Sequence, residues 1–144
     1  MKTRITVTEL SHEDLVDILS TALYGCDYLA SDYNRDTWNK IPEDKKEGDC
    51  YEDHLADMLL NGHYIALTDV YAEGQIYGKK KHKMPASIDE ERNVTYCLSL
   101  EDLLWACSSP RGYKLVTETL SGEGDYFTAN NLLQIALFGE EVYG

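Results

Sequence analysis

The residues best able to do chemistry lie between positions 27 and 57, where carboxylates are interleaved with aromatic rings. A carboxylate forms charge-assisted ion pairs with Arg and Lys, and the face of a Tyr or Trp ring attracts the same cations. Together these side chains suit a basic, Arg-rich protein surface. The predicted partner-binding residues are Asp27, Tyr28, Asp32, Tyr33, Asp36, Trp38, Glu43, Asp44, Glu47, Asp49, Tyr51, Glu52, Asp53 and Asp57.

Catalytic and metal-binding patterns in this region are weak. His54 lies close in sequence to Asp53 and Asp57, which would suit an acid–base pair, but no motif connects a nucleophile to it. Cys50 and His54 lie one helical turn apart, and His63 follows, but the Cys and His residues are too scattered to favour a zinc site. The sequence has no Gly-rich phosphate-binding loop. We therefore predict that the protein is not an enzyme and uses no cofactor and no metal.

The charge of the chain indicates the same kind of partner. It has 26 acidic and 13 basic residues, a formal net charge of -13, and residues 5–78 hold 16 of the acids but only four of the bases. Because non-specific affinity for nucleic acids depends on Lys and Arg, this excess excludes a general nucleic-acid binder. An acidic surface can serve solubility alone. The sharper interpretation is an acidic face that partly imitates DNA phosphates and competes for a basic groove.

Tyrosine is the second unusual feature, with 11 Tyr against two Phe. A Tyr side chain combines a large apolar ring with a polar tip, which suits the anchor positions of an interface. Three tyrosines fall in predicted helices or strands and are expected instead in the core or at its boundary. They are Tyr24, Tyr64 and Tyr96.

Length and composition predict one domain, residues 1–144, in the cytoplasm. The chain is 43% hydrophobic and 27% charged, as globular domains are. It has no N-terminal apolar segment typical of a signal peptide and no run of about 20 apolar residues that would span a membrane. Cys26, Cys50, Cys97 and Cys107 are irregularly spaced, which predicts reduced thiols.

Capping signals and periodicity predict the elements that position these residues. Ser11–Asp14 and Ser99–Asp102 have the spacing of capping boxes, so each begins a helix, and His12 in the first of them is expected at the surface. A further helix begins with the N-cap Ser109 and Pro110 and reaches Leu120. The other predicted helices cover residues 50–61 and 129–138, the latter capped by Thr128, and the predicted strands or extended pieces cover residues 4–8, 64–68, 75–77 and 93–97.

Two segments lack such periodicity. Residues 28–53 predict a long loop with about one helical turn, so we expect an acidic, Tyr-rich loop at about residues 27–50. Lys79–Lys83 predicts a solvated basic tip within a basic insertion at about residues 70–92. The composite is an α+β fold, with a small antiparallel sheet packed with three to four helices on one face.

Three stretches of the sequence resemble those of a known protein family. They are Ile5-Thr6-Val7-Thr8 leading into residues 15–25, the aromatic follow-on at Tyr28 and Tyr33, and the closing residues 133–144, which are the most specific. In these stretches the chain resembles a family of small acidic proteins encoded by phages and prophages of gut-type Gram-positive bacteria. Residues 70–92 depart from the pattern as an insertion.

The resemblance implies a mobile-element origin and assigns no catalytic residues. Small acidic phage proteins are frequently inhibitors of host defence, including anti-CRISPR proteins that occupy the nucleic-acid groove of an effector nuclease. We therefore expect a non-enzymatic inhibitor in the host bacterial cell that binds a basic, nucleic-acid-handling surface, such as that of a CRISPR nuclease, by partial DNA mimicry.

Two other functions stay open. The first is a self-assembling phage accessory or scaffold protein, a homo-oligomer whose symmetric interface uses Tyr and the C-terminal helix. The second is a sponge for nucleotide signals. A sponge would need cationic phosphate clamps, built from two or more of Arg4, Arg35, Arg92 and Arg111 in one pocket.

Overall fold

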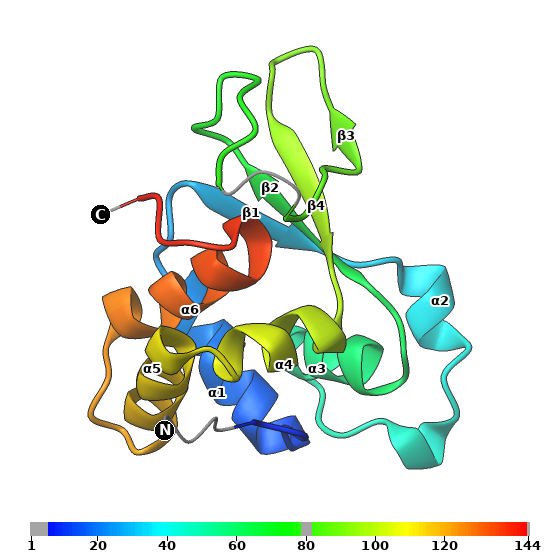
Figure 1. Ribbon diagram of the computed structural model, residues 1–144. Coiled ribbons are helices and arrows are strands. Elements are labelled where there is room, and N and C mark those ends of the chain that lie inside the picture. Colours follow the sequence, from blue (N-terminus) through cyan, green and yellow to red (C-terminus); the bar gives the residue numbers. More distant parts are fainter. Residues whose placement is uncertain (1–5, 79–81, 144) are drawn as a thin grey trace.

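A computed structural model describes residues 6–78 and 82–143 of the chain. Figure 1 shows the helices gathered on one side of a small sheet, while the β3–β4 hairpin projects away from them. In chain order the elements are α1 (His12–Leu23), β1 (Leu29–Asp32), α2 (Arg35–Asn39), the 3-10 helix η1 (Glu43–Lys45), α3 (Tyr51–Leu60), β2 (Ile65–Asp69), β3 (Ser87–Ile88), β4 (Val94–Leu98), α4 (Leu100–Cys107), α5 (Pro110–Leu120) and α6 (Tyr126–Phe138).

The sheet is antiparallel throughout, with the strand order β1-β2-β4-β3. Along β2 and β4 buried and half-buried residues alternate, so that Leu67 and its partner Tyr96 face the core. On the other face the hydroxyls of Thr68 and Thr95 lie 2.7 Å apart across the two strands. This two-residue period produces a sheet with one apolar face, which confirms the predicted α+β class.

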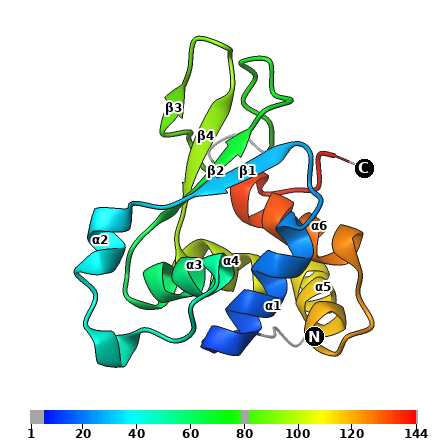
Figure 2. The same ribbon diagram turned by 180° about the vertical axis from the view of Figure 1, so that it is seen from behind.

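Helix α6 forms the centre of the helical layer. Residues 132–138 are all buried, and α1, α4 and α5 pack around the helix (Figure 2). Its last residue, Phe138, meets the buried ring of Tyr96 edge to face at 5.6 Å, which joins the helices to the sheet. Gly139 ends the helix in the left-handed conformation, with a φ of 77°, which favours glycine.

The predicted helix starts are confirmed by their caps. The Ser11 hydroxyl accepts a hydrogen bond from the Asp14 N–H at 3.0 Å, and Ser99 accepts one from Asp102 at 3.1 Å. In turn, the carboxylate of each Asp accepts a hydrogen bond from the backbone N–H of the serine that caps the same helix. Ser109 caps α5 as predicted. These caps formed as expected because all their partners lie within three residues of one another.

The prediction of a long loop over residues 27–50 was wrong, because this segment contains β1, α2 and η1. In β1 only Leu29 is buried, so the strand has no apolar pattern of its own and is held by pairing with β2. Helix α2 is capped by Asn34, whose side chain accepts from the Thr37 N–H at 3.0 Å. With α2 included, the described part of the chain has six α-helices rather than three to four.

Two other boundaries differ from the predictions. Residues 6–8 are not a strand, and Val7 donates instead to the Ser108 hydroxyl at 2.9 Å; the predicted strand's first two residues lie outside the described ones. Helix α6 begins at Tyr126 rather than at residue 129. Its N-cap is Asp125, whose carboxylate accepts from the Thr128 N–H at 3.1 Å. A side-chain carboxylate caps a helix as effectively as a hydroxyl, so α6 starts after Asp125 and not after the predicted cap Thr128.

Of the three tyrosines that were predicted to lie in the core or at its boundary, one does so. Tyr96 is fully buried in β4, as expected. Tyr24 and Tyr64 are exposed, by 88% and 59%, because Tyr24 comes just after α1 and Tyr64 just before β2, where neither ring faces the core.

The predicted basic insertion, residues 70–92, includes β3, which pairs with β4. Of the predicted basic tip, Lys79 to Lys81 lie outside the described residues. His82 packs onto α6, with its Nε2 atom 3.0 Å from the Ala136 carbonyl oxygen, and Lys83 forms a 2.9 Å ion pair with Asp102. Among residues 6–78 and 82–143, no helix combines the length and apolarity needed to cross a membrane.

Candidate functional site

The carboxylates of residues 32–52, all exposed except the half-buried Glu52, lie on a continuous stretch of chain that runs from the end of β1 through α2 and η1 to the start of α3. We call this surface the acidic flank. Figure 1 shows α2 and η1 at one side of the molecule, opposite the side where the C-terminus lies. The flank carries Asp32, Asp36, Glu43, Asp44, Glu47, Asp49 and Glu52.

The segment of the acidic flank, residues 32–52, carries seven acids and four bases, which leaves a formal net charge of -3. Asp32 forms a 2.6 Å ion pair with Arg35, and Glu43 forms a 3.1 Å pair with Lys46. The hydrogen bond from Arg35 holds the pKa of Asp32 below its usual value. Four carboxylates form no ion pair with any residue in the described part of the chain, and they are Asp36, Asp44, Asp49 and Glu52.

A polar network beneath the flank fixes it to the rest of the fold. Asp57, only 1% exposed, accepts hydrogen bonds from the Trp38 ring N–H and the Glu47 backbone N–H, both at 3.1 Å. His12 on α1 donates to Asp53 at 2.9 Å and has its other ring nitrogen 3.4 Å from Asp57. The bond from His12 lowers the pKa of Asp53. The network therefore ties the segment before α3 to both α1 and α3.

The sequence did not favour an acid–base pair of His54 with Asp53 or Asp57, and in the structure His12 contacts both carboxylates. His12 was expected at the surface, yet its side chain is only 12% exposed. Its partner Asp53 is 41 residues away in sequence, so no local pattern could have identified the pair. The arrangement joins α1 to α3 and is best explained as structural support.

The aromatic residues near the flank are mostly engaged within the protein. Trp38 stacks on His54 at 3.9 Å, and the Lys46 ammonium lies 3.9 Å from the centre of the Trp38 ring. The Tyr33 hydroxyl lies 2.6 Å from His54 Nδ1, so neither ring of that pair is free. Tyr51 is the more exposed ring, with its hydroxyl hydrogen-bonded to Ser31. The flank thus presents carboxylates and one Tyr rather than alternating acids and rings.

His54 does not join Cys50 and His63 in a metal site. Its ring is held between Trp38 and Tyr33, and within residues 6–78 and 82–143 no group of three or more His, Cys, Asp or Glu side chains is arranged to hold a metal ion. All four cysteines are free thiols.

Two of the predicted binding residues lie away from the flank. Asp27 and Tyr28 precede β1, at the strand end opposite α2. Asp27 is exposed, whereas Tyr28 is buried with its ring 4.5 Å from that of Tyr143 in the C-terminal tail. The fold therefore divides the predicted set into the acidic flank, the supporting pair Asp53 and Asp57, and a separate aromatic region.

Comparisons with protein-family models, with curated proteins and with solved structures found no match to this chain.

Proposed function

We propose that this chain is a non-enzymatic inhibitor of bacterial host defence, encoded by a phage or another mobile element and acting in the host cytoplasm. Its acidic flank binds a basic, nucleic-acid-handling surface, and a CRISPR effector nuclease is the first target to test. The proposal rests mainly on the four carboxylates of the flank that have no cationic partner among the described residues. Uncompensated charge on one side attracts a basic surface and speeds the encounter with it.

The number of carboxylates favours partial rather than complete mimicry of DNA. Duplex DNA carries one negative charge per about 1.7 Å of its axis, so the seven carboxylates of the flank match the charge of about 12 Å of duplex. Two of the seven are already paired with Arg35 and Lys46. The flank can therefore replace DNA over a short part of a basic groove, and the rest of the interface must come from other contacts.

The network under the flank contributes to affinity by pre-organisation. A loop that becomes ordered on binding loses conformational entropy, which weakens the complex. Here His12, Trp38 and Asp57 hold the segment in place before a partner arrives.

The alternatives receive less support. Residues 132–138 of α6 are buried between the other helices, so this part of the helix does not offer the surface that a symmetric interface needs. For a nucleotide sponge, Arg35, Arg92 and Arg111 lie in different parts of the fold, and Arg35 and Arg111 are paired with carboxylates. Arg4 lies outside the described residues.

Displacement of DNA tests the proposal. A labelled target duplex is bound to a purified CRISPR effector with its guide RNA, and the chain is titrated in while anisotropy is followed. We expect displacement that weakens by about tenfold or more between about 0.1 M and about 1 M salt, because the Debye length falls from about 10 Å to about 3 Å.

Two charge-reversal variants locate the binding surface. The first changes Asp36, Asp44, Asp49 and Glu52 to Lys, and the second changes Glu90, Glu91, Glu123 and Glu140, which are exposed elsewhere. Both move the net charge from -13 to -5, since each reversal adds two. The proposal requires that the first variant lose displacement and the second keep most of it. Equal losses, or displacement that does not depend on salt, would show that the flank is not the binding surface.

A further inference from the structure

A pocket of about 410 Å³ lies away from the acidic flank, where the turn between α1 and β1, the loop after β2, the start of α6 and the C-terminal tail meet. Its volume falls within the range of about 300–1,000 Å³ that is typical of small-ligand sites. Half of its ten lining residues are aromatic, and they are Tyr28, Tyr71, Tyr126, Phe127 and Tyr143. The rings of Tyr71 and Phe127 are more than half exposed, so aromatic surface is open to a ligand.

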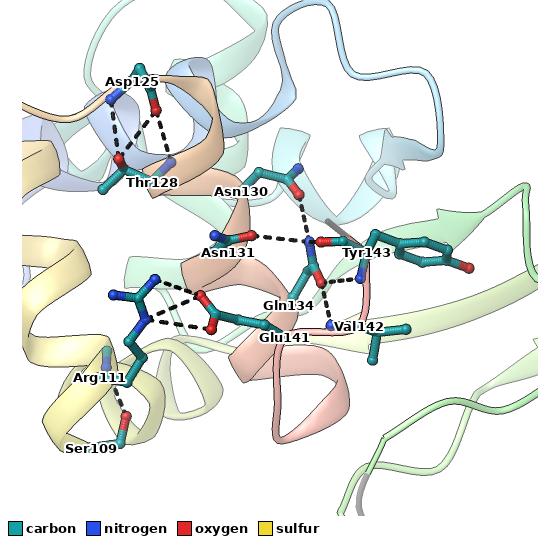
Figure 3. Close-up of polar contacts among 11 residues, drawn as sticks. Ser109, Arg111, Asp125, Thr128, Asn130, Asn131, Gln134, Glu141, Val142 and Tyr143 are labelled. Carbon is teal, nitrogen blue, oxygen red and sulfur yellow. Dashed lines mark hydrogen bonds and ion pairs between the residues drawn. The ribbon is translucent and has the colours of Figure 1, made fainter.

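Buried amides hold the wall of the pocket in place. Gln134, 1% exposed, accepts from the backbone N–H groups of Val142 and Tyr143 at 2.6 and 2.8 Å, and its own N–H group donates to Asn130 at 3.0 Å (Figure 3). Asn130 also accepts from the Tyr28 hydroxyl and donates to the Ala22 carbonyl. Because Asn130 and Gln134 use their hydrogen-bonding groups inside the protein, they orient the rings and leave ligand recognition to other groups.

The charge of the pocket selects the class of ligand. Among the lining residues, all within the described part of the chain, Asp27 is the one carboxylate and none is Lys, Arg or His. Burial raises the pKa of Tyr28, Tyr126 and Tyr143 above the ordinary range, so these phenols stay neutral. An anionic ligand would face Asp27 and a net charge of -13 without a compensating cation. An organic cation meets a carboxylate and electron-rich ring faces.

Among organic cations, the planar guanidinium group fits this chemistry best. It stacks on aromatic faces, pairs with a carboxylate through two parallel hydrogen bonds, and is more weakly hydrated than an ammonium group. Asp27 is exposed and lines the pocket together with Tyr71, and its interaction with the Tyr71 phenol raises the pKa of that group, so the carboxylate lies near an exposed ring. We propose that the pocket binds an alkylguanidinium group, either as a free small molecule or as the arginine side chain of a partner, with Asp27 as counter-ion and the exposed rings as walls. This inference does not depend on the acidic flank.

Titration of the isotope-labelled protein with blocked arginine, followed by NMR at about 0.15 M salt, tests the proposal. Blocked citrulline, which has nearly the same shape but no charge, is the matched ligand control. We expect blocked arginine to shift the side-chain amide signals of Asn131 and Gln134, and citrulline to leave them in place. A second titration with methylguanidinium separates the two sources. Equal affinity indicates a free cation and tighter binding of blocked arginine indicates a partner side chain, and both results support the proposed chemistry.

Variants at exposed positions complete the test without disturbing the core. Asp27→Asn should weaken binding of blocked arginine by about tenfold, because a charge-assisted contact is lost. Phe127→Ala should weaken it by about threefold. Asp17→Asn removes an exposed carboxylate of α1 outside the pocket and should change nothing. Equal binding of citrulline, unchanged affinity in Asp27→Asn, or shifts confined to residues 32–52 would overturn the proposal, whatever the outcome of the DNA displacement assay.

Discussion

Replacing Gln134 with Leu should detach the C-terminal tail from α6 and destabilise the whole domain. The Gln134 carbonyl oxygen is the acceptor for two consecutive backbone N–H groups, those of Val142 and Tyr143, and its N–H group donates to the Tyr143 carbonyl at 3.0 Å. Leu has nearly the same size and a high helix propensity, so the change removes these hydrogen bonds while disturbing the helix backbone little.

The expected loss follows from the three hydrogen bonds. Each contributes about 0.5–1.5 kcal/mol net, so together they contribute about 3 kcal/mol. Asn130 keeps the hydrogen bond from Tyr28, so no further buried acceptor is left without a donor. The half-buried tail groups regain some hydrogen bonding from water, and the Leu side chain recovers some free energy by burial. We therefore expect Gln134→Leu to lower the free energy of unfolding by about 2–3 kcal/mol.

Urea unfolding followed by circular dichroism measures this loss. The midpoint should fall while the slope with urea stays unchanged, because the surface exposed on unfolding is the same. Hydrogen exchange should show faster exchange of the Val142 and Tyr143 amides. Asn131→Ala is the control, since it removes only a 3.3 Å contact with Gln134, and it should lie within about 0.5 kcal/mol of the wild type. If Gln134→Leu were as stable as this control and its tail amides stayed protected, the assigned role of Gln134 would be wrong.

The remaining predictions concern two carboxylates of opposite behaviour and one helix cap. The hydrogen bond from His12 lowers the folded-state pKa of Asp53, so the ionised carboxylate stabilises the fold above the unfolded-state pKa of about 3.9, and this stabilisation is lost as the pH falls. In urea titrations the wild type should therefore exceed Asp53→Asn in free energy of unfolding by less at about pH 3 than at about pH 6. Burial raises the folded-state pKa of Asp69, so the free energy of unfolding of the wild type relative to that of Asp69→Asn should be higher at about pH 4 than at about pH 7. If the two variants showed pH trends of the same sign, both assignments would be wrong. Ser99→Ala removes the cap of α4 and should cost about 1 kcal/mol in thermal unfolding, and no change would show that the cap contributes nothing.

The sequence by itself determined the features that depend on near neighbours. Ser11 and Ser99 cap helices because their partners lie three residues away, and the alternation in β2 and β4 marks which side chains face the core. These patterns were enough to predict the α+β class and most helix starts. The excess of acids in the first half of the chain was also evident from the sequence alone.

Only the tertiary structure decided the features that join distant segments. Strand β1 exists because Ala30 and Thr68 are paired across the sheet, and no local apolar pattern marks the strand. His12 supports the acidic flank through Asp53, which lies 41 residues further along the chain. The pocket beside Asp27 forms where four segments meet, with Tyr143 contributed by the C-terminal tail. Hydrogen bonds and burial between such segments depend on how the whole chain packs, and periodicity and capping signals describe only a few neighbouring residues.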